Sequence, residues 1–215
     1  MKSLLEPLDW LEIQRRYKQR VKESANLRRF FEARNVPAFS ELALGMSHPA
    51  GNYSAAEHGL GPKILDSNPN ARGQVYQLAG KFLPLTEANS VPTLIKDANI
   101  KWLKIGVGSE LSCMMNPFVC WGCNRKTIWM YLARTQSVGT ANDALQLFTE
   151  RDRDSPMAYD SWEEAYHPEL GPELMLVAQE GTSLAKGFGV VPRALIPYLW
   201  ADAIASAAFD FYRPK

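Results

Sequence analysis

The sequence predicts an all-α protein, a single globular multi-helix domain of about seven to nine helices. Apolar residues recur at three- and four-residue steps, helix-start signals recur along the chain, and the period-two alternation of strands is almost missing. The 215 residues are 46% hydrophobic and 22% charged, which suits a chain with a buried core. We expect one domain over residues 1–215, with a basic N-terminal helix (1–36), an irregular loop (45–70) and a helical core (71–215).

The first helix is predicted to begin at Asp9. Asp9 is an N-cap residue, and Glu12 follows three positions later, in the spacing of a capping box. Helical steps of apolar residues continue to about Asn35, and Pro37 then stops the helix.

The segment 45–70 is rich in Gly, Pro, Asn and Ser, which favours an irregular loop. Within it, Ser54 and Glu57 predict a short helix near residues 54–60. A loop of this length in a compact domain is usually functional or mobile. We interpret His48 and His58, both in this segment, as surface histidines.

The remaining helices are placed by their start signals. One is expected at 71–82, one from 90–93 towards Met115 unless the glycines of "GVGS" break it, and one from Asn116–Pro117 to about Arg134. Further starts are expected at Thr140, Ser155–Pro156, Gly171–Pro172 and Pro192, with Pro197 as a kink or as the true start of the last helix.

All three cysteines lie in one stretch, "SCMMNPFVCWGC". Their spacing is incomplete for a zinc site, which usually has four ligands. Apolar neighbours favour buried structural cysteines, and no metal or cofactor is expected. A redox or metal site remains the alternative, and it is built on Cys113, Cys120 and Cys123.

Two acids stand in apolar surroundings, Glu110 and Asp202. Buried acids need cationic partners. The candidates are Arg125, Lys126 and Arg134, and of these we expect Arg125 to be the partner. The structural interpretation is an ion pair that fixes helix register. The functional one is a polar pocket between helices, lined by Glu110, Asn124, Arg125 and Asp202.

The first helix is strongly basic, and part of its charge shares one face. A solvated helix face is the simplest interpretation. The alternative is a surface for an acidic partner or for phosphates. The candidate contact residues are Arg15, Arg16, Lys18, Lys22 and Arg29.

These observations favour a non-catalytic helical protein of the bacterial cytoplasm. It would bind a protein, or with less support a nucleic acid, through the basic helix and the 45–70 loop. The net charge of +1 gives no general attraction to nucleic acid or anionic membranes, and we expect no membrane contact. The N-terminus has no signal-peptide pattern, and no apolar run reaches the length of a span. An enzyme or ligand-binding bundle built on the polar pocket, or a cysteine-based metal or redox site, is the alternative.

Overall fold

The structure is a computed structural model that describes residues 3–151, 166–190, 192 and 194–213. Over these residues it is all-helical and forms one compact domain without strands. The described part contains eleven α-helices and one short 3-10 helix, so the expected seven to nine is too low. The elements are α1 (Trp10–Glu32), α2 (Val36–Ala43), η1 (Pro49–Gly51), α3 (Tyr53–Glu57), α4 (Leu60–Ser67), α5 (Ala71–Phe82), α6 (Val91–Ala98), α7 (Ile105–Met115), α8 (Arg125–Thr135), α9 (Val138–Arg151), α11 (His167–Gly187) and α12 (Pro197–Tyr212).

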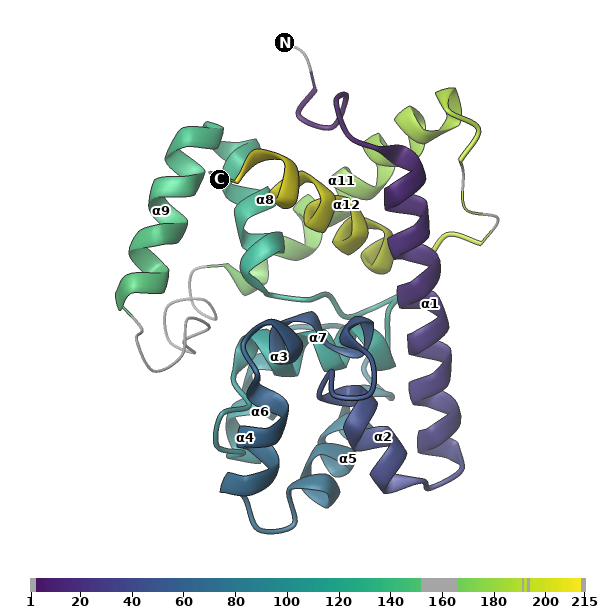
Figure 1. Cartoon of the computed structure of the whole chain (residues 1–215), viewed down its shortest axis with the longest axis vertical. Coiled ribbons are helices and arrows are strands. Elements are labelled where there is room, and N and C mark those ends of the chain that lie inside the picture. Colours follow the sequence, from purple (N-terminus) through teal and green to yellow (C-terminus); the bar gives the residue numbers. More distant parts are fainter. Residues whose placement is uncertain (1–2, 152–165, 191, 193, 214–215) are drawn as a thin grey trace.

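Helix α1 runs along the molecule and joins its two halves (Figure 1). Helices α2 to α7 gather beside its C-terminal half, and α8, α9, α11 and α12 gather beside its N-terminal half (Figure 1). One connected hydrophobic core runs through both halves, and it includes the buried tryptophans Trp10, Trp129 and Trp200. The midpoint of α1 therefore lies where the two halves meet.

The predicted start of α1 is confirmed. The Asp9 carboxylate accepts hydrogen bonds from the backbone N–H groups of Leu11 (3.0 Å) and Glu12 (3.1 Å). The helix ends at Glu32, slightly before the expected Asn35, because Arg34 takes a left-handed conformation (φ 53°) and Asn35 then caps α2.

The prediction of an irregular loop at 45–70 is wrong, because this segment folds into η1, α3 and α4. Its many Gly and Asn residues serve as turns and caps between short helices: Gly59 has a positive φ of 58°, and the Asn52 side chain accepts from Ala55 N. The short helix expected at 54–60 corresponds to α3, which starts slightly earlier. Buried Leu60 and Ile64 attach α4 to the core.

The helix expected from 90–93 to Met115 is two helices. The break lies at Asn99 (φ 48°) and Trp102 (φ 70°), before the glycines rather than at them. Gly108 is inside α7, where an added Cβ would lie 2.6 Å from Ile95 Cδ1. Glycine there lets α6 and α7 pack closely.

The predicted start of the next helix, at Asn116–Pro117, is also wrong. Residues 116–124 form a connection that is buried except at Phe118 and Val119, and α8 begins only at Arg125. Asn124 and Thr127 form a reciprocal capping box there, which fixes the start of the helix. The Asn116 side chain instead donates to the carbonyls of Phe82 (3.1 Å) and Leu85 (2.9 Å).

In the C-terminal part, the expected helix from Ser155–Pro156 lies outside the described residues. The restart expected at Gly171–Pro172 is wrong, because α11 runs unbroken through Pro172 from its start at His167. Pro197, rather than Pro192, begins α12. Among the described helices, none combines the length and apolarity that a bilayer crossing requires.

Candidate functional site

A buried ion network lies where the two halves of the molecule meet. Arg20 of α1 is fully buried, with Nε 3.1 Å from Asp202 Oδ2 on α12 and Nη2 3.5 Å from Glu110 Oε2 on α7. Its Nη1 donates to the carbonyl of Ala50 in η1 at 2.9 Å. The three charged residues are called the buried triad below, and they connect four elements.

Glu110 is held by neutral donors as well as by Arg20. Its carboxylate accepts from the N–H of Tyr53 (2.8 Å), from the N–H and hydroxyl of Ser54 (3.1 and 2.6 Å) and from the Asn124 amide (3.0 Å). These donors come from α3 and the α8 cap. Both carboxylate oxygens of Glu110 are therefore satisfied, as a buried acid requires.

The triad's protonation follows from burial and from mutual attraction. Desolvation disfavours the charged form of Arg20, but the carboxylates of Asp202 and Glu110 outweigh it, so its pKa rises further above its ordinary value. Burial raises the pKa of Glu110, whereas Arg20 and the Ser54 hydroxyl act in the opposite direction. Arg20 is thus the fixed positive charge of the triad.

The four predicted pocket residues have different roles. Glu110, Asn124 and Asp202 come together in the network, with Asn124 Nδ2 3.5 Å from Asp202 Oδ1. Arg125 is not their cationic partner, which corrects that expectation: its guanidinium lies over the Phe209 ring at 5.2 Å. The hollow beside Glu110 and Arg125 leaves no room for a water molecule. The packing suits a structural network better than a ligand pocket.

Sequence reasoning missed Arg20 as the triad's cation, and counted it with the other charges of the basic helix. A signal was present, since Arg20 continues the apolar stripe at helical steps from Ile13 and Tyr17 to Ser24 and Leu27. All these residues are buried. A charge on an apolar stripe indicates a buried partner on another element.

The outward face of α1 carries a basic stripe, defined as Arg15, Lys18, Lys22 and Arg29, all exposed. Their polar contacts are local: Arg15 binds Glu12 at 2.7 Å, Lys18 donates to Gln14 at 3.0 Å and Arg29 to Asn26 at 3.2 Å. Arg16, also a predicted contact residue, is half-buried and turned aside from the stripe, with Glu12 (2.8 Å) and Asp210 (2.7 Å) as partners.

A small polar notch adjoins the stripe. It has a volume of about 280 Å³ and lies between α1, residues 48–53, the start of α8 and α12. Its charged lining consists of Arg15, Arg16 and Lys126 with the acid Glu12. The predicted binding helix and part of the 45–70 segment thus share one surface depression.

Tyr53 forms part of the wall between the notch and the buried triad. Its ring is contacted by the Arg20 guanidinium (4.8 Å) and by the Lys126 ammonium (5.0 Å). Lys126 also forms an ion pair with Glu57. The notch and the triad therefore share one aromatic residue.

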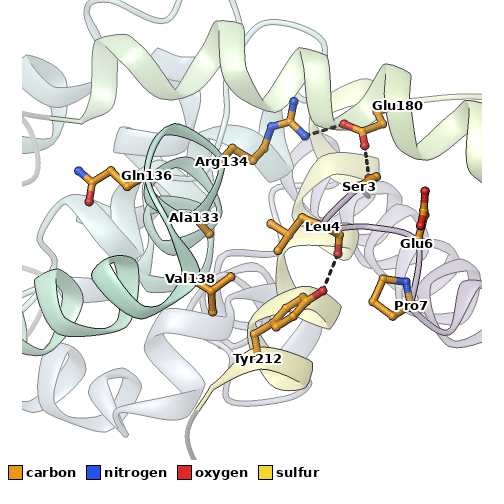
Figure 2. A pocket seen from close by; sticks show the side chains of 10 residues that line it. All are labelled: Ser3, Leu4, Glu6, Pro7, Ala133, Arg134, Gln136, Val138, Glu180 and Tyr212. Atoms are coloured by element: carbon orange, nitrogen blue, oxygen red, sulfur yellow. Dashed lines mark hydrogen bonds and ion pairs between the residues drawn. The ribbon is translucent and has the colours of Figure 1, made fainter. Parts of the chain in front are cut away.

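A larger groove of about 860 Å³ lies between the N-terminal segment and α8, α11 and α12. Figure 2 shows Ser3 and Arg134 both directed at Glu180, and the Tyr212 hydroxyl directed at the Leu4 carbonyl. These contacts dock residues 3–7 on the C-terminal helices.

The cysteines are all buried, with exposed fractions of 0–1%. Burial raises the pKa of Cys113 well above its ordinary value and that of Cys120 to about 11, so neither thiol is an activated nucleophile. Within the described ranges, no three or more His, Cys, Asp or Glu residues lie together in a way that would hold a metal ion.

The histidines differ from the surface interpretation. His48 is half-buried, its Nδ1 accepts from Ala50 N at 3.0 Å, and it lines the notch. His58 is also partly buried, and desolvation lowers its pKa. His167 is buried against Trp121 with ring centroids 5.1 Å apart, and desolvation lowers its pKa to about 4.

Comparisons of the chain with protein-family models, with curated proteins and with solved structures each found no match.

Proposed function

We propose that this protein is a non-catalytic binding protein that recognises an acidic protein partner through the basic stripe of α1 and the adjoining residues 48–53. The observation that carries the proposal is that Arg15, at one end of the basic stripe, borders the same notch as residues 48–53, so the stripe and this part of the 45–70 segment adjoin on the surface. A positive stripe steers an acidic partner and fixes its register.

The surroundings of the stripe support a binding role. Among the described residues, Arg15, Lys18 and Arg29 have only local, exposed polar contacts, and such contacts contribute little to stability. A stripe with no large structural role is free to exchange its local partners for those of another protein. The charges of the buried triad, in contrast, are paired with one another inside the fold.

Site-specific photo-cross-linking tests the proposal in cells that express the protein. A photoreactive phenylalanine derivative replaces Lys22 on the stripe, and in a matched control it replaces Lys96, an exposed lysine of α6. We expect a discrete protein adduct from position 22 only, identified by mass spectrometry. The adduct should disappear when Lys18→Glu reverses a neighbouring charge.

Two results would overturn the proposal. Identical adducts from positions 22 and 96 would show that the stripe has no special role. An adduct that nuclease removes would make the partner a nucleic acid, which is the less supported alternative.

A further inference from the structure

The polar notch has features of a binding site that the basic stripe alone lacks. Its lining includes Ser206 of α12, which is 2% exposed. No described residue hydrogen-bonds to Ser206 Oγ. Because a buried hydroxyl without a partner carries a desolvation cost, Ser206 is available to an occupant of the notch.

The cations at the notch are already paired, which constrains the occupant. Glu12 binds Arg15 and Arg16, Asp210 binds Arg16, and Glu57 binds Lys126. A carboxylate would only replace one of these acids with another. An occupant with more charge and more acceptor atoms than a carboxylate would be favoured.

A phosphomonoester meets this requirement, since it carries about −1.5 to −2 charges and three strong acceptor oxygens. Arginine forks, a lysine and a hydroxyl are all typical donors to phosphate. The notch's volume of about 280 Å³ suits a chemical group of a larger partner rather than a whole cofactor.

We propose that the notch binds the phosphomonoester of a phosphorylated side chain on the partner, with Arg15, Arg16 and Lys126 as cations and Ser206 Oγ as a hydroxyl donor. This inference rests on the proposed function, because it names the group that the partner presents. Binding exchanges Glu12 for phosphate at the two arginines.

The test uses the full chain and a fluorescent nonapeptide of glycine and serine with one central phosphoserine, followed by fluorescence polarisation. We expect the phosphopeptide to bind at least about tenfold more tightly than the same peptide with serine, as expected for charge-assisted hydrogen bonds. The affinity should fall as salt rises. Equal binding of the two peptides would overturn the proposal.

Three variants assign the binding to the notch. Ser206→Ala and Lys126→Met should each weaken phosphopeptide binding several-fold. Ser206→Ala should not lower thermal stability, because no described residue hydrogen-bonds to its buried hydroxyl. Glu12→Gln should tighten phosphopeptide binding, because it removes the acid that competes for the two arginines. If Glu12 had a purely structural role, the substitution would not tighten binding. Parent-like affinity in all three variants would place the binding elsewhere and contradict the proposal.

Two further ligands test whether the notch prefers a phosphorylated side chain to free phosphate or to a carboxylate. Inorganic phosphate should compete only at much higher concentration than the phosphopeptide, and affinity equal to that of the phosphopeptide would make the site one for free phosphate. A peptide with glutamate in place of phosphoserine should bind weakly, and equal affinity would make the preferred group a carboxylate. Both of those results would overturn the proposal.

The outcomes separate this inference from the proposed function. Suppose that the cross-link at position 22 persists in the Ser206→Ala variant and that the protein shows no preference for the phosphopeptide. The phosphate-binding inference would then be wrong, and the proposed partner-binding surface would stand. Phosphopeptide binding without any cross-link at position 22 would support the phosphate-binding notch and contradict the partner-binding role of the stripe.

Discussion

The two faces of α1 carry the same kind of charge in opposite surroundings. On the inner face, Arg20 is enclosed by Asp202, Glu110 and the Ala50 carbonyl, and it touches elements from both halves of the molecule. On the outer face, Arg15 pairs with Glu12 on its own helix, and its side chain is 76% exposed. Position on the helix therefore decides the surroundings of each arginine: Arg20 is paired with residues of other elements inside the fold, and Arg15 is exposed and paired within its own helix.

The largest expected effect is on the inner face. Arg20→Met keeps an unbranched apolar stem, removes the guanidinium and leaves Asp202 and Glu110 without their cation. Loss of one member of a buried ion group typically costs about 3–5 kcal/mol in the free energy of unfolding. Urea denaturation measures it, and a midpoint like that of the parent protein would show that the triad does not stabilise the fold.

His167 provides a second buried titratable group to compare with Arg20, because burial holds His167 neutral whereas Arg20 is charged. Its pKa of about 4 in the fold lies below the ordinary 6.5, so the unfolded chain takes up the proton first as pH falls. The stabilisation is therefore complete above pH 6.5 and is lost as pH falls towards 4. The loss amounts to roughly 3 kcal/mol over this window.

The matched variant is His167→Phe, which keeps an aromatic ring against Trp121. Denaturation at a series of pH values should show a smaller decline below pH 6.5 in this variant than in the parent. Parallel curves for the two proteins would mean that His167 is accessible to protons in the fold.

A smaller effect is expected from the cysteines, which are buried but uncharged. Cys120→Ser places a hydroxyl in an apolar site and should cost about 1–3 kcal/mol. Thiol titration of the native protein should be slow for all three cysteines and rapid after denaturation. Stoichiometric zinc or iron in protein purified without added metal would instead support the site on Cys113, Cys120 and Cys123.

The smallest expected effect on the free energy of unfolding is at the outer face of α1. Lys22→Ala should change the free energy of unfolding by less than about 0.5 kcal/mol, as is usual for exposed positions. Thermal denaturation checks this. A loss of several kcal/mol would mean that the stripe has a structural role and would weaken its assignment to binding.

The sequence predicts much of the fold, because its signals are local. Asp9 caps α1 as expected, and the helix expected at 71–82 is α5. The errors arise where two local signals compete: Asn116–Pro117 resembles a helix start, but the capping box of Asn124 and Thr127 defines the real one. In the 45–70 segment, turn residues separate short helices whose apolar contacts come from distant parts of the chain.

The candidate site could be predicted only in part. Burial of Glu110 and Asp202 followed from their apolar neighbours, and the structure confirms it. Their pairing with Arg20 did not follow, because it joins positions about 90 and 180 residues apart, which local spacing does not encode. The notch could not be predicted either, because it is lined by residues from separate helices, such as Arg16 of α1 and Ser206 of α12.

The central claim is that Arg20 and the acids around it act as one unit that joins the two halves of the molecule. A double-mutant cycle of Arg20→Met and Asp202→Asn, measured by urea denaturation, tests it most directly. Asparagine keeps the shape of Asp202 and removes its charge, so the double variant leaves fewer unpaired acids than Arg20→Met alone. We expect the double variant to be more stable than Arg20→Met, with a coupling energy of about 1–3 kcal/mol. Additive losses, with no coupling between the two positions, would contradict the account.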